Sequence, residues 1–197
     1  MTSEQFNFFW TSKYPTTIPL SYCFRHDYND RWFRIHSLPE SKRYADNDEE
    51  WNILLARQNK IISDLLGTSS QLYAVIGEYN YDGKNETPEF LNNKLFRDLK
   101  FTDLDSIDMH KINPNENDER TIYRPFIAEL AWKENMYDNI LKSIANGEIR
   151  VFFISVEQKR LIAPYDGGMD FILESKEIKD SFKAKYKDWL SAREDGT

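Results

Sequence analysis

The chain has almost no cysteine, no long apolar run and no excess of basic residues. One cysteine in 197 residues excludes a disulfide framework and a zinc site built from several thiolates. No hydrophobic stretch approaches the roughly 20 residues that span a bilayer, and the N-terminus lacks the basic start and apolar core of a secretory signal. We therefore expect a soluble, cytoplasmic protein with no membrane association, in which the lone thiol stays reduced.

Familiar catalytic signatures are also missing. The histidines, His26, His36 and His110, are not at helical or zinc-ligand spacing, and no glycine-rich phosphate loop, dinucleotide fingerprint or nucleophile elbow occurs. Cys23 could pair with His26 or His36 as a nucleophile, but a lone cysteine between two aromatic residues is more often core filling. We expect no cofactor and no metal, and we favour a protein that is not an enzyme.

Acidic residues dominate the charge balance. Asp and Glu outnumber Lys and Arg by 33 to 26, giving a net charge of -7, whereas nucleic-acid binding requires a basic face. Nucleic acid is therefore not an expected partner. Carboxylates gather in residues 102–119, which could present an acidic surface to a basic protein partner, as nuclease inhibitors do. The simpler interpretation of this segment is a solvated loop.

Aromatic residues are abundant, at 15% of the chain, and their excess lies before residue 45. The same region contains three of the seven prolines, which bias the preceding residues toward extended conformations. The sequence therefore predicts a wrapped N-terminal arm with short helical or extended pieces. What this arm covers is a question for the structure.

The hydrophobic pattern predicts an α+β fold in one domain over residues 1–197. We expect the arm and a first strand in 1–45 and a long, partly acidic surface excursion in 82–120, with a short strand near 107–112. Strands are predicted at 31–38, 72–79, 120–132, 149–156, 160–163 and 169–173, with Pro125 forcing its strand toward an edge or a bulge. Helices are predicted at 47–66, around 137–144 and from 175 onward, with Asp46 and Ser175 as N-caps and Arg57 turned outward. Together these give a mainly antiparallel sheet of five or six strands, ending in a three-stranded meander and packed by about three helices.

The first candidate site is residues 31–44, RWFRIHSLPESKRY, which we call the basic motif. Its candidate ligand-binding residues are Arg31, Arg34, His36, Ser37, Lys42 and Arg43. Guanidinium groups match carboxylate or phosphate geometry, and a serine-containing loop adds further donors. The alternative is structural: the arginines neutralise internal carboxylates and the other residues belong to the edge of the core.

The second candidate is residues 164–170, PYDGGMD, which we call the glycine turn. Asp166 and Asp170 could act as an acid–base or metal-binding pair around the two glycines. A hard cation usually needs more oxygen ligands than this segment offers. The structural alternative is a hairpin turn in which the glycines adopt positive φ.

Several segments together resemble a known family. The run RWFRIHSLPESKRYA at 31–45, the helix with Arg57-Gln58-Asn59, PYDGGMD at 164–170 and DWLS at 188–191 are similar to a family of uncharacterised bacterial proteins of about this length, found in cyanobacteria among others. The resemblance implies a bacterial, cytoplasmic origin and no assigned activity. The closing hairpin and helix resemble, more loosely, small bacterial domains of the toxin-immunity kind.

Three functional hypotheses remain open at this point. The leading one is a non-enzymatic binding module, such as an immunity-like protein, that uses the acidic surface or the aromatic arm against a protein partner. The alternative is an enzyme or receptor for a small anionic molecule or phosphate, built on the basic motif and the two aspartates. The third is an oligomer with an aromatic subunit interface, because nothing in the sequence sets the oligomeric state. A cavity where the two motifs meet would favour the second hypothesis.

Overall fold

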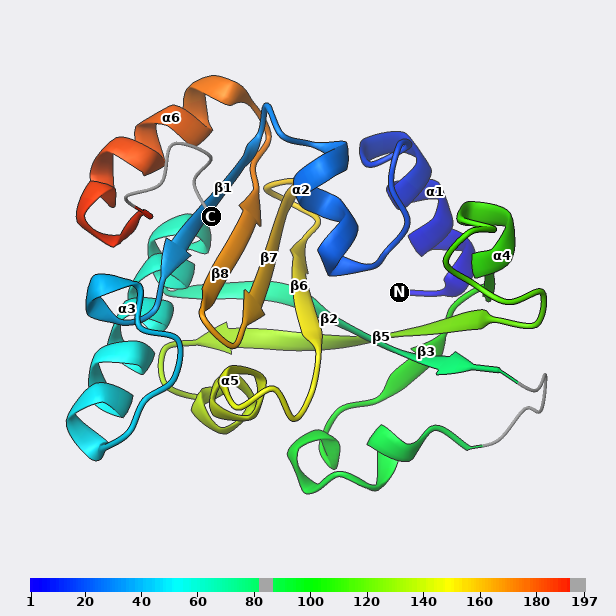
Figure 1. Ribbon diagram of the computed structural model, residues 1–197, viewed down its shortest axis with the longest axis horizontal. Helices are drawn as coiled ribbons and strands as arrows, with labels where there is room; N and C mark the ends of the chain where they lie inside the picture. The colour runs from blue at the N-terminus through cyan, green and yellow to red at the C-terminus, as the bar shows by residue number, and fades with distance from the viewer. Residues whose placement is uncertain (82–86, 192–197) are drawn as a thin grey trace.

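An eight-stranded antiparallel sheet organises the chain (Figure 1). The computed structural model describes residues 1–81 and 87–191. The strands are β1 (Trp32–His36), β2 (Ser69–Asn80), β3 (Phe101–Asp103), β4 (Ile107–Asp108), β5 (Ile122–Lys133), β6 (Val151–Ser155), β7 (Arg160–Tyr165) and β8 (Gly168–Ile172). Their order is β1-β8-β7-β6-β2-β5-β3, with β4 also paired to β5. The α+β class and the antiparallel sheet are confirmed, while five or six strands was too low a prediction.

Helices cover both faces of this sheet. One face carries α3 (Asp48–Leu66), α5 (Asp138–Ala145) and α6 (Lys176–Lys185), and the other carries α1 (Ser3–Lys13) and α2 (Phe24–Asp27). Along β6, Phe153 joins the first core, whereas Phe152 and Ile154 join the second. Successive side chains of a strand point to opposite faces, and because both faces of β6 are covered, residues 151–154 are all apolar.

The N-terminal arm covers the second face of the sheet. Thr2 caps α1, and its capping box is completed by the side chain of Gln5. The buried rings of the arm are Phe6, Phe9, Trp10, Tyr14, Phe24, Tyr28 and Trp32. The rings of Trp10 and Phe24 lie 6.0 Å and 5.1 Å from that of Phe152 on β6. Most of the aromatic excess is therefore core, and hydrophobic burial accounts for it.

The predicted meander is present but does not end the sheet. β6, β7 and β8 pair in chain order, as expected from their short connections. β1 then adds outside β8, with Arg34 opposite Asp170, so that the meander lies inside the sheet and the N-terminal strand forms its edge.

β5 lies in the interior of the sheet, so the prediction that it could be an edge strand was wrong. Pro125 predicted an edge or a bulge, because proline cannot donate to a strand ladder. β5 instead pairs with β2 on one side and with β3 and β4 on the other. On the β3 and β4 side, the strand pairing is interrupted opposite the proline. The register changes from Asp103↔Phe126 in β3 to Ile107↔Tyr123 in β4, so the two partner strands are offset from each other by one residue. The irregularity lies in the partner strands.

The described residues form six α-helices, twice the predicted number, because α1, α2 and α4 (Met109–Ile112) were not recognised as helices. Short 3-10 turns occur at Ser21–Cys23, Pro39–Ser41, Glu89–Asn92, Lys94–Phe96 and Lys187–Trp189. α3 begins one residue later than expected: Asn47, not Asp46, is its N-cap and accepts from the backbone N–H of Glu50 at 3.0 Å. Ser175 caps α6 as predicted.

The described part of the 82–120 excursion packs against the domain. β4 falls in the predicted 107–112 region, but the chain then continues as α4. Asp105 accepts hydrogen bonds from Ser3 Oγ at 3.0 Å and Asn7 Nδ2 at 2.6 Å on α1. Residues 82–86 of the excursion lie outside the described residues. Among residues 1–81 and 87–191, no helix combines the length and apolar character needed to cross a membrane.

Candidate functional site

The basic motif and the glycine turn meet in space. β1 pairs with β8 along its length, and beyond the ladder the N–H of Ser37 donates to the carbonyl of Gly167 at 3.2 Å. A Cβ on Gly168 would lie 1.9 Å from the carbonyl oxygen of Ile35, so only glycine permits this approach. The hairpin turn is confirmed, but its proposed reason was wrong: the positive-φ glycines of the described chain are Gly67 and Gly147.

Arg34 and Asp170 form a bidentate ion pair at this junction. Arg34 Nε lies 2.6 Å from Asp170 Oδ1, and Nη2 lies 2.8 Å from Oδ2. The guanidinium also lies 4.4 Å from the centre of the Tyr165 ring, a cation–π distance. Burial raises the pKa of Tyr165 to about 12, so its hydroxyl stays protonated at neutral pH. These contacts support the structural interpretation of Arg34 and also hold its guanidinium in one orientation.

Arg43 and Asp166 form a second, more exposed pair. Asp166 Oδ2 accepts from Arg43 Nε at 2.9 Å and from the hydroxyl of Tyr44 at 2.8 Å. Burial works to raise the pKa of Asp166, but these hydrogen bonds outweigh it and hold the pKa below its usual value. The Asp166 carboxylate therefore stays ionised, while 64% of the Arg43 side chain remains exposed beside it.

The loop that carries Arg43 has an unfavourable backbone conformation. Glu40 and Ser41 both have a φ of 56°, in the left-handed region that residues other than glycine rarely adopt. Each such residue costs about 1–3 kcal/mol and persists only where surrounding contacts hold it, often at functional sites. The ion pair between Arg43 and Asp166 is one such contact.

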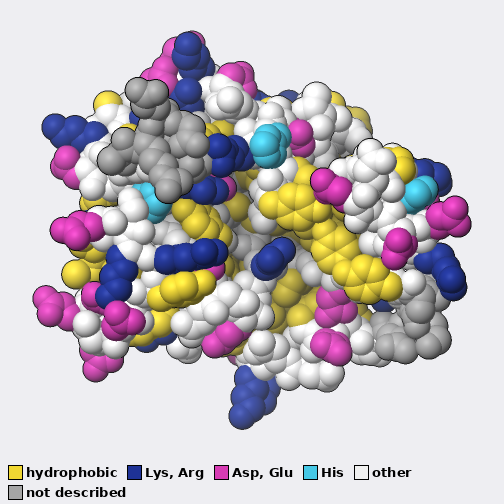
Figure 2. All heavy atoms as spheres, in the orientation of Figure 1, with side chains coloured by type: hydrophobic (Ala, Val, Ile, Leu, Met, Phe, Trp, Pro, Cys, Tyr) yellow, Lys and Arg dark blue, Asp and Glu magenta, His cyan; other side chains and the backbone are white. Residues whose placement is uncertain are grey.

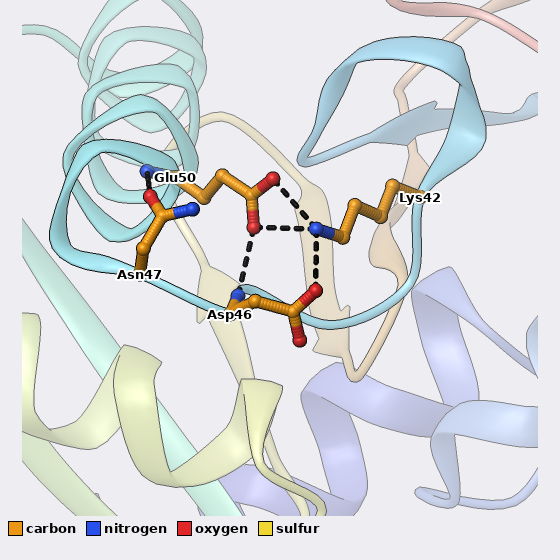
Figure 3. Close-up of polar contacts among 4 residues, drawn as sticks. All are labelled: Lys42, Asp46, Asn47 and Glu50. Atoms are coloured by element: carbon orange, nitrogen blue, oxygen red, sulfur yellow. Dashed lines mark hydrogen bonds and ion pairs between the residues drawn. The ribbon is translucent and has the colours of Figure 1, made fainter.

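Lys42 supports the fold and does not join the site (Figure 3). Its ammonium lies 2.8 Å from a carboxylate oxygen of Asp46 and 2.6 Å from Glu50. Glu50 also accepts from the backbone N–H of Asp46 at 2.7 Å, while Asn47 caps α3 beside it. Lys42 thus ties the loop to the N-terminus of α3.

Ser37 and the backbone of His36 attach β1 to α3. Ser37 is buried and its hydroxyl accepts from Gln58 Nε2 at 2.9 Å, and the His36 carbonyl accepts from Arg57 Nη1 at 3.2 Å. The prediction that Arg57 points outward was therefore wrong, because this bond and the Trp189 ring hold it half-buried. Arg31 lies over the ring of Tyr28, 4.5 Å from its centre.

Four of the eight candidate residues line one cavity, which we call the motif cavity. They are Arg34, Arg43, Asp166 and Asp170, and the cavity volume is about 560 Å³. Arg31, His36, Ser37 and Lys42 are not among its lining residues. The space-filling view shows a hollowed region in the middle of the molecular surface, with hydrophobic and basic side chains around it (Figure 2). The cavity is of the size that binds small ligands.

Sequence reasoning missed other residues of the motif cavity. Tyr44, Arg150 and Tyr165 also line it. Arg150 directly precedes β6 and makes no ion pair with any residue that the structure describes. The only sequence signal was its position: an arginine that flanks a fully buried strand lies where that strand emerges from the core.

A second cavity of about 470 Å³ adjoins the first, and we call it the tyrosine cavity. Both are lined by Ser21, Tyr22, Gly147, Ile149 and Arg150, so the two cavities lie side by side, and we call them together the groove. The hydroxyls of Tyr22 and Tyr79 lie 3.0 Å apart in the tyrosine cavity. The ring of Tyr123 lies against Gly77, where a Cβ would come within 2.3 Å of it.

Metal and thiol chemistry receive little support from the described residues. Within 1–81 and 87–191, no three His, Cys, Asp or Glu side chains are grouped so that they could hold a metal ion. Burial raises the pKa of the Cys23 thiol to about 11, which keeps it protonated at neutral pH. Cys23 packs with Leu20 and Met109, as its interpretation as core filling predicted.

Comparison with known proteins identifies the family. Residues 20–194 match the family described as "Domain of unknown function (DUF3885)". The chain belongs to this family. The match includes both motifs and every strand of the sheet, which agrees with the expected resemblance to an uncharacterised family. No curated protein and no solved structure matches the chain.

Proposed function

We propose that this DUF3885 protein binds a small ligand through a carboxylate or phosphate group held in the motif cavity. The observation that supports this most strongly is the convergence of the basic motif and the glycine turn on one cavity, beside the guanidinium of Arg150. Among the described residues that line the cavity, three guanidinium groups, of Arg34, Arg43 and Arg150, stand beside two carboxylates, which is an excess of one positive charge. An anionic group would balance it.

The existing ion pairs orient this site for a ligand. A guanidinium has five N–H donors, and Arg43 uses those on Nε and Nη2 for Asp166, which leaves others for a ligand. Arg150, which also lines the cavity, brings a further guanidinium with its own donors. A preorganised site loses less side-chain entropy on binding than a flexible one.

The acidic excursion offers less support for a protein partner. Asp105 binds α1, Asp108 caps α4 and pairs with Lys111, and Asp103 lies 3.6 Å from Arg124. Much of its charge is therefore used within the fold. The aromatic arm is likewise mostly buried, so the groove offers the better-formed binding surface.

Isothermal titration calorimetry tests the proposal with inorganic phosphate and with N-acetyl-trialanine, whose only charge is a carboxylate. We expect saturable binding of at least one, weakened about 10-fold or more by Arg150→Gln, because a charge-assisted hydrogen bond contributes about 1.5–3 kcal/mol. Arg120→Gln, at an exposed arginine outside the groove, is the matched control and should bind as the native chain does. Absence of saturable binding, or equal affinity in both variants, would contradict the proposal.

A further inference from the structure

The groove continues from the motif cavity into the tyrosine cavity because the sheet opens between them. β6 pairs with β2 only from Tyr73↔Ile154 to Ile76↔Val151, whereas β2 continues to Asn80. Beyond Val151 the edge of β2 faces residues 147–150, which lead away toward α5. This gap joins the two cavities across the position that β6 would otherwise occupy.

Charge changes sign along this groove. At the motif end, the guanidinium groups of Arg34, Arg43 and Arg150 outnumber the carboxylates. The tyrosine cavity is lined by Glu78, Glu89 and Glu148, and Arg150 is the one cation among the described residues that line it. Arg150 also lines the motif cavity. A ligand with charges of both signs would match this distribution.

Glu78 is the best-placed carboxylate at the acidic end. Its Oε1 accepts from the backbone N–H of Phe90 at 3.1 Å, which fixes the side chain over the cavity. Arg124 is its cross-strand neighbour, but the Arg124 guanidinium lies 3.6 Å from Asp103 and is not part of the cavity wall. Glu148 is held differently, by Ser143 Oγ at 2.7 Å.

The middle of the groove is aromatic. Tyr22 lines both cavities, and Tyr79, Phe90 and Tyr123 line the acidic one. Burial raises the pKa of Tyr79 and of Tyr123, so their hydroxyls stay protonated and can donate hydrogen bonds. Such a wall suits peptide groups and small apolar side chains, which combine polar and apolar surface.

The sheet also sets the length of the ligand. The motif end lies over β7 and the acidic end over β2, and these two strands are neighbours of β6 on opposite sides. Two strand spacings amount to about 10 Å. Three residues of extended peptide also span about 10 Å.

Building on the proposed function, we infer that the ligand is a zwitterion of about tripeptide length, such as a short peptide with free ends. Its carboxylate lies against Arg43 and Arg150, and its ammonium group lies against Glu78. Its backbone contacts the tyrosines between them.

Three probes in calorimetry test this inference: trialanine, N-acetyl-trialanine and trialanine amide. We expect trialanine to bind at least 10-fold more tightly than either blocked peptide, because each block removes one of the two charged contacts. If N-acetyl-trialanine binds as tightly as trialanine, the inference fails and the proposed function stands. If neither binds, and phosphate does not, the proposed function fails as well. Tighter binding of a nucleoside monophosphate than of trialanine would also overturn the inference.

Variants separate the two ends of the groove. Glu78→Gln keeps an acceptor for the Phe90 N–H and should therefore fold normally, which the thermal midpoint checks. This substitution should weaken the binding of trialanine about 10-fold and leave the affinity for N-acetyl-trialanine unchanged. Glu157→Gln, at an exposed glutamate in the turn after β6, is the matched control. A Glu78→Gln chain that binds trialanine like the native protein would overturn the assignment of the acidic end.

Discussion

Arg34 and Asp170 face each other across β1 and β8 and share two hydrogen bonds, of 2.6 Å and 2.8 Å. The pair joins the edge strand to the meander and forms part of the wall of the motif cavity. Only 19% and 12% of the two side chains are exposed, so removal of one partner leaves a largely desolvated charge.

Asp170→Ala should therefore lower the free energy of unfolding by about 3 kcal/mol, as loss of one partner of a buried pair does. Urea denaturation followed by tryptophan fluorescence measures this. The double variant Arg34→Met/Asp170→Leu should be more stable than Asp170→Ala, because it replaces both members of the pair with apolar side chains of similar volume. A single variant within 0.5 kcal/mol of the native chain, roughly the effect of a surface substitution, would show that the pair is not structural.

Gly168→Ala should prevent close packing of β1 on β8. The added Cβ would lie 1.9 Å from the backbone oxygen of Ile35, and the strand must move to relieve this overlap. Gly167→Ala is the control: its Cβ would lie 2.9 Å from the ring of Tyr165, which is a side chain and can shift. We expect the first variant to unfold at a clearly lower urea concentration than the second. Equal midpoints would contradict the close approach.

Ser41→Gly should stabilise the protein by about 0.5–1 kcal/mol. The left-handed conformation at φ 56° costs a residue with a Cβ about 1–2 kcal/mol, and glycine removes this cost while increasing the entropy of the unfolded chain. Ser12→Gly in α1 should instead destabilise by about 0.5–1 kcal/mol, because glycine disfavours helix. Chemical denaturation of both variants tests the opposite signs. Destabilisation by Ser41→Gly would mean that the serine side chain matters more than its backbone.

Asp64 should contribute to the stability of the protein in acid. Burial tends to raise its pKa, but hydrogen bonds from Lys185, Lys60 and Tyr186 dominate and lower the pKa to about 2. A carboxyl with a pKa depressed in the folded state stabilises it above the unfolded pKa, near 4, and this contribution is lost as pH falls toward 2. We expect Asp64→Asn to be less stable than the native chain at pH 7, with the difference disappearing near pH 2.

Denaturation curves from pH 7 to pH 2 measure this dependence. Asp118→Asn, at an exposed aspartate, should parallel the native chain throughout. If the difference between Asp64→Asn and the native protein were constant with pH, the contacts of Asp64 would not depend on its charge. Because Lys185 and Tyr186 tie the end of α6 to Asp64 on α3, the protection of α6 amides against hydrogen exchange, relative to the intrinsic rate at each pH, should decrease in the same acid range.

Local patterns predicted most of the elements. Helix α3, strands β1, β2 and β6, the N-cap at Ser175 and the end of α5 at Asn146-Gly147 follow from periodicity and turn residues, which act over a few positions. Helix α1 was missed because its apolar residues are not confined to one stripe, and it is stabilised by burial of aromatic rings. The prediction that Pro125 would place its strand at an edge was wrong, because the sheet accommodates this proline through a break between β3 and β4.

In the candidate site too, local patterns predicted some features and long-range contacts decided the others. The basic motif and glycine turn were identifiable from residue types alone, but the pairing of their side chains was not: Arg43 pairs with Asp166, and Arg34 with Asp170. Arg150, Tyr22, Tyr79 and Tyr123 come from segments that sequence reasoning assigned to ordinary strands and the arm. Pairing between residues more than 100 positions apart leaves no local pattern.

The sequence by itself determined the α+β class, the antiparallel sheet and the two motifs, because side-chain periodicity and turn chemistry are properties of neighbouring residues. Only the tertiary structure decided that the motifs meet at a cavity, and that a sheet opening between β6 and β2 extends this cavity into a groove. Strand order and register are set by burial across the whole chain, so the charges that face one another in the groove are known only once the sheet is assembled.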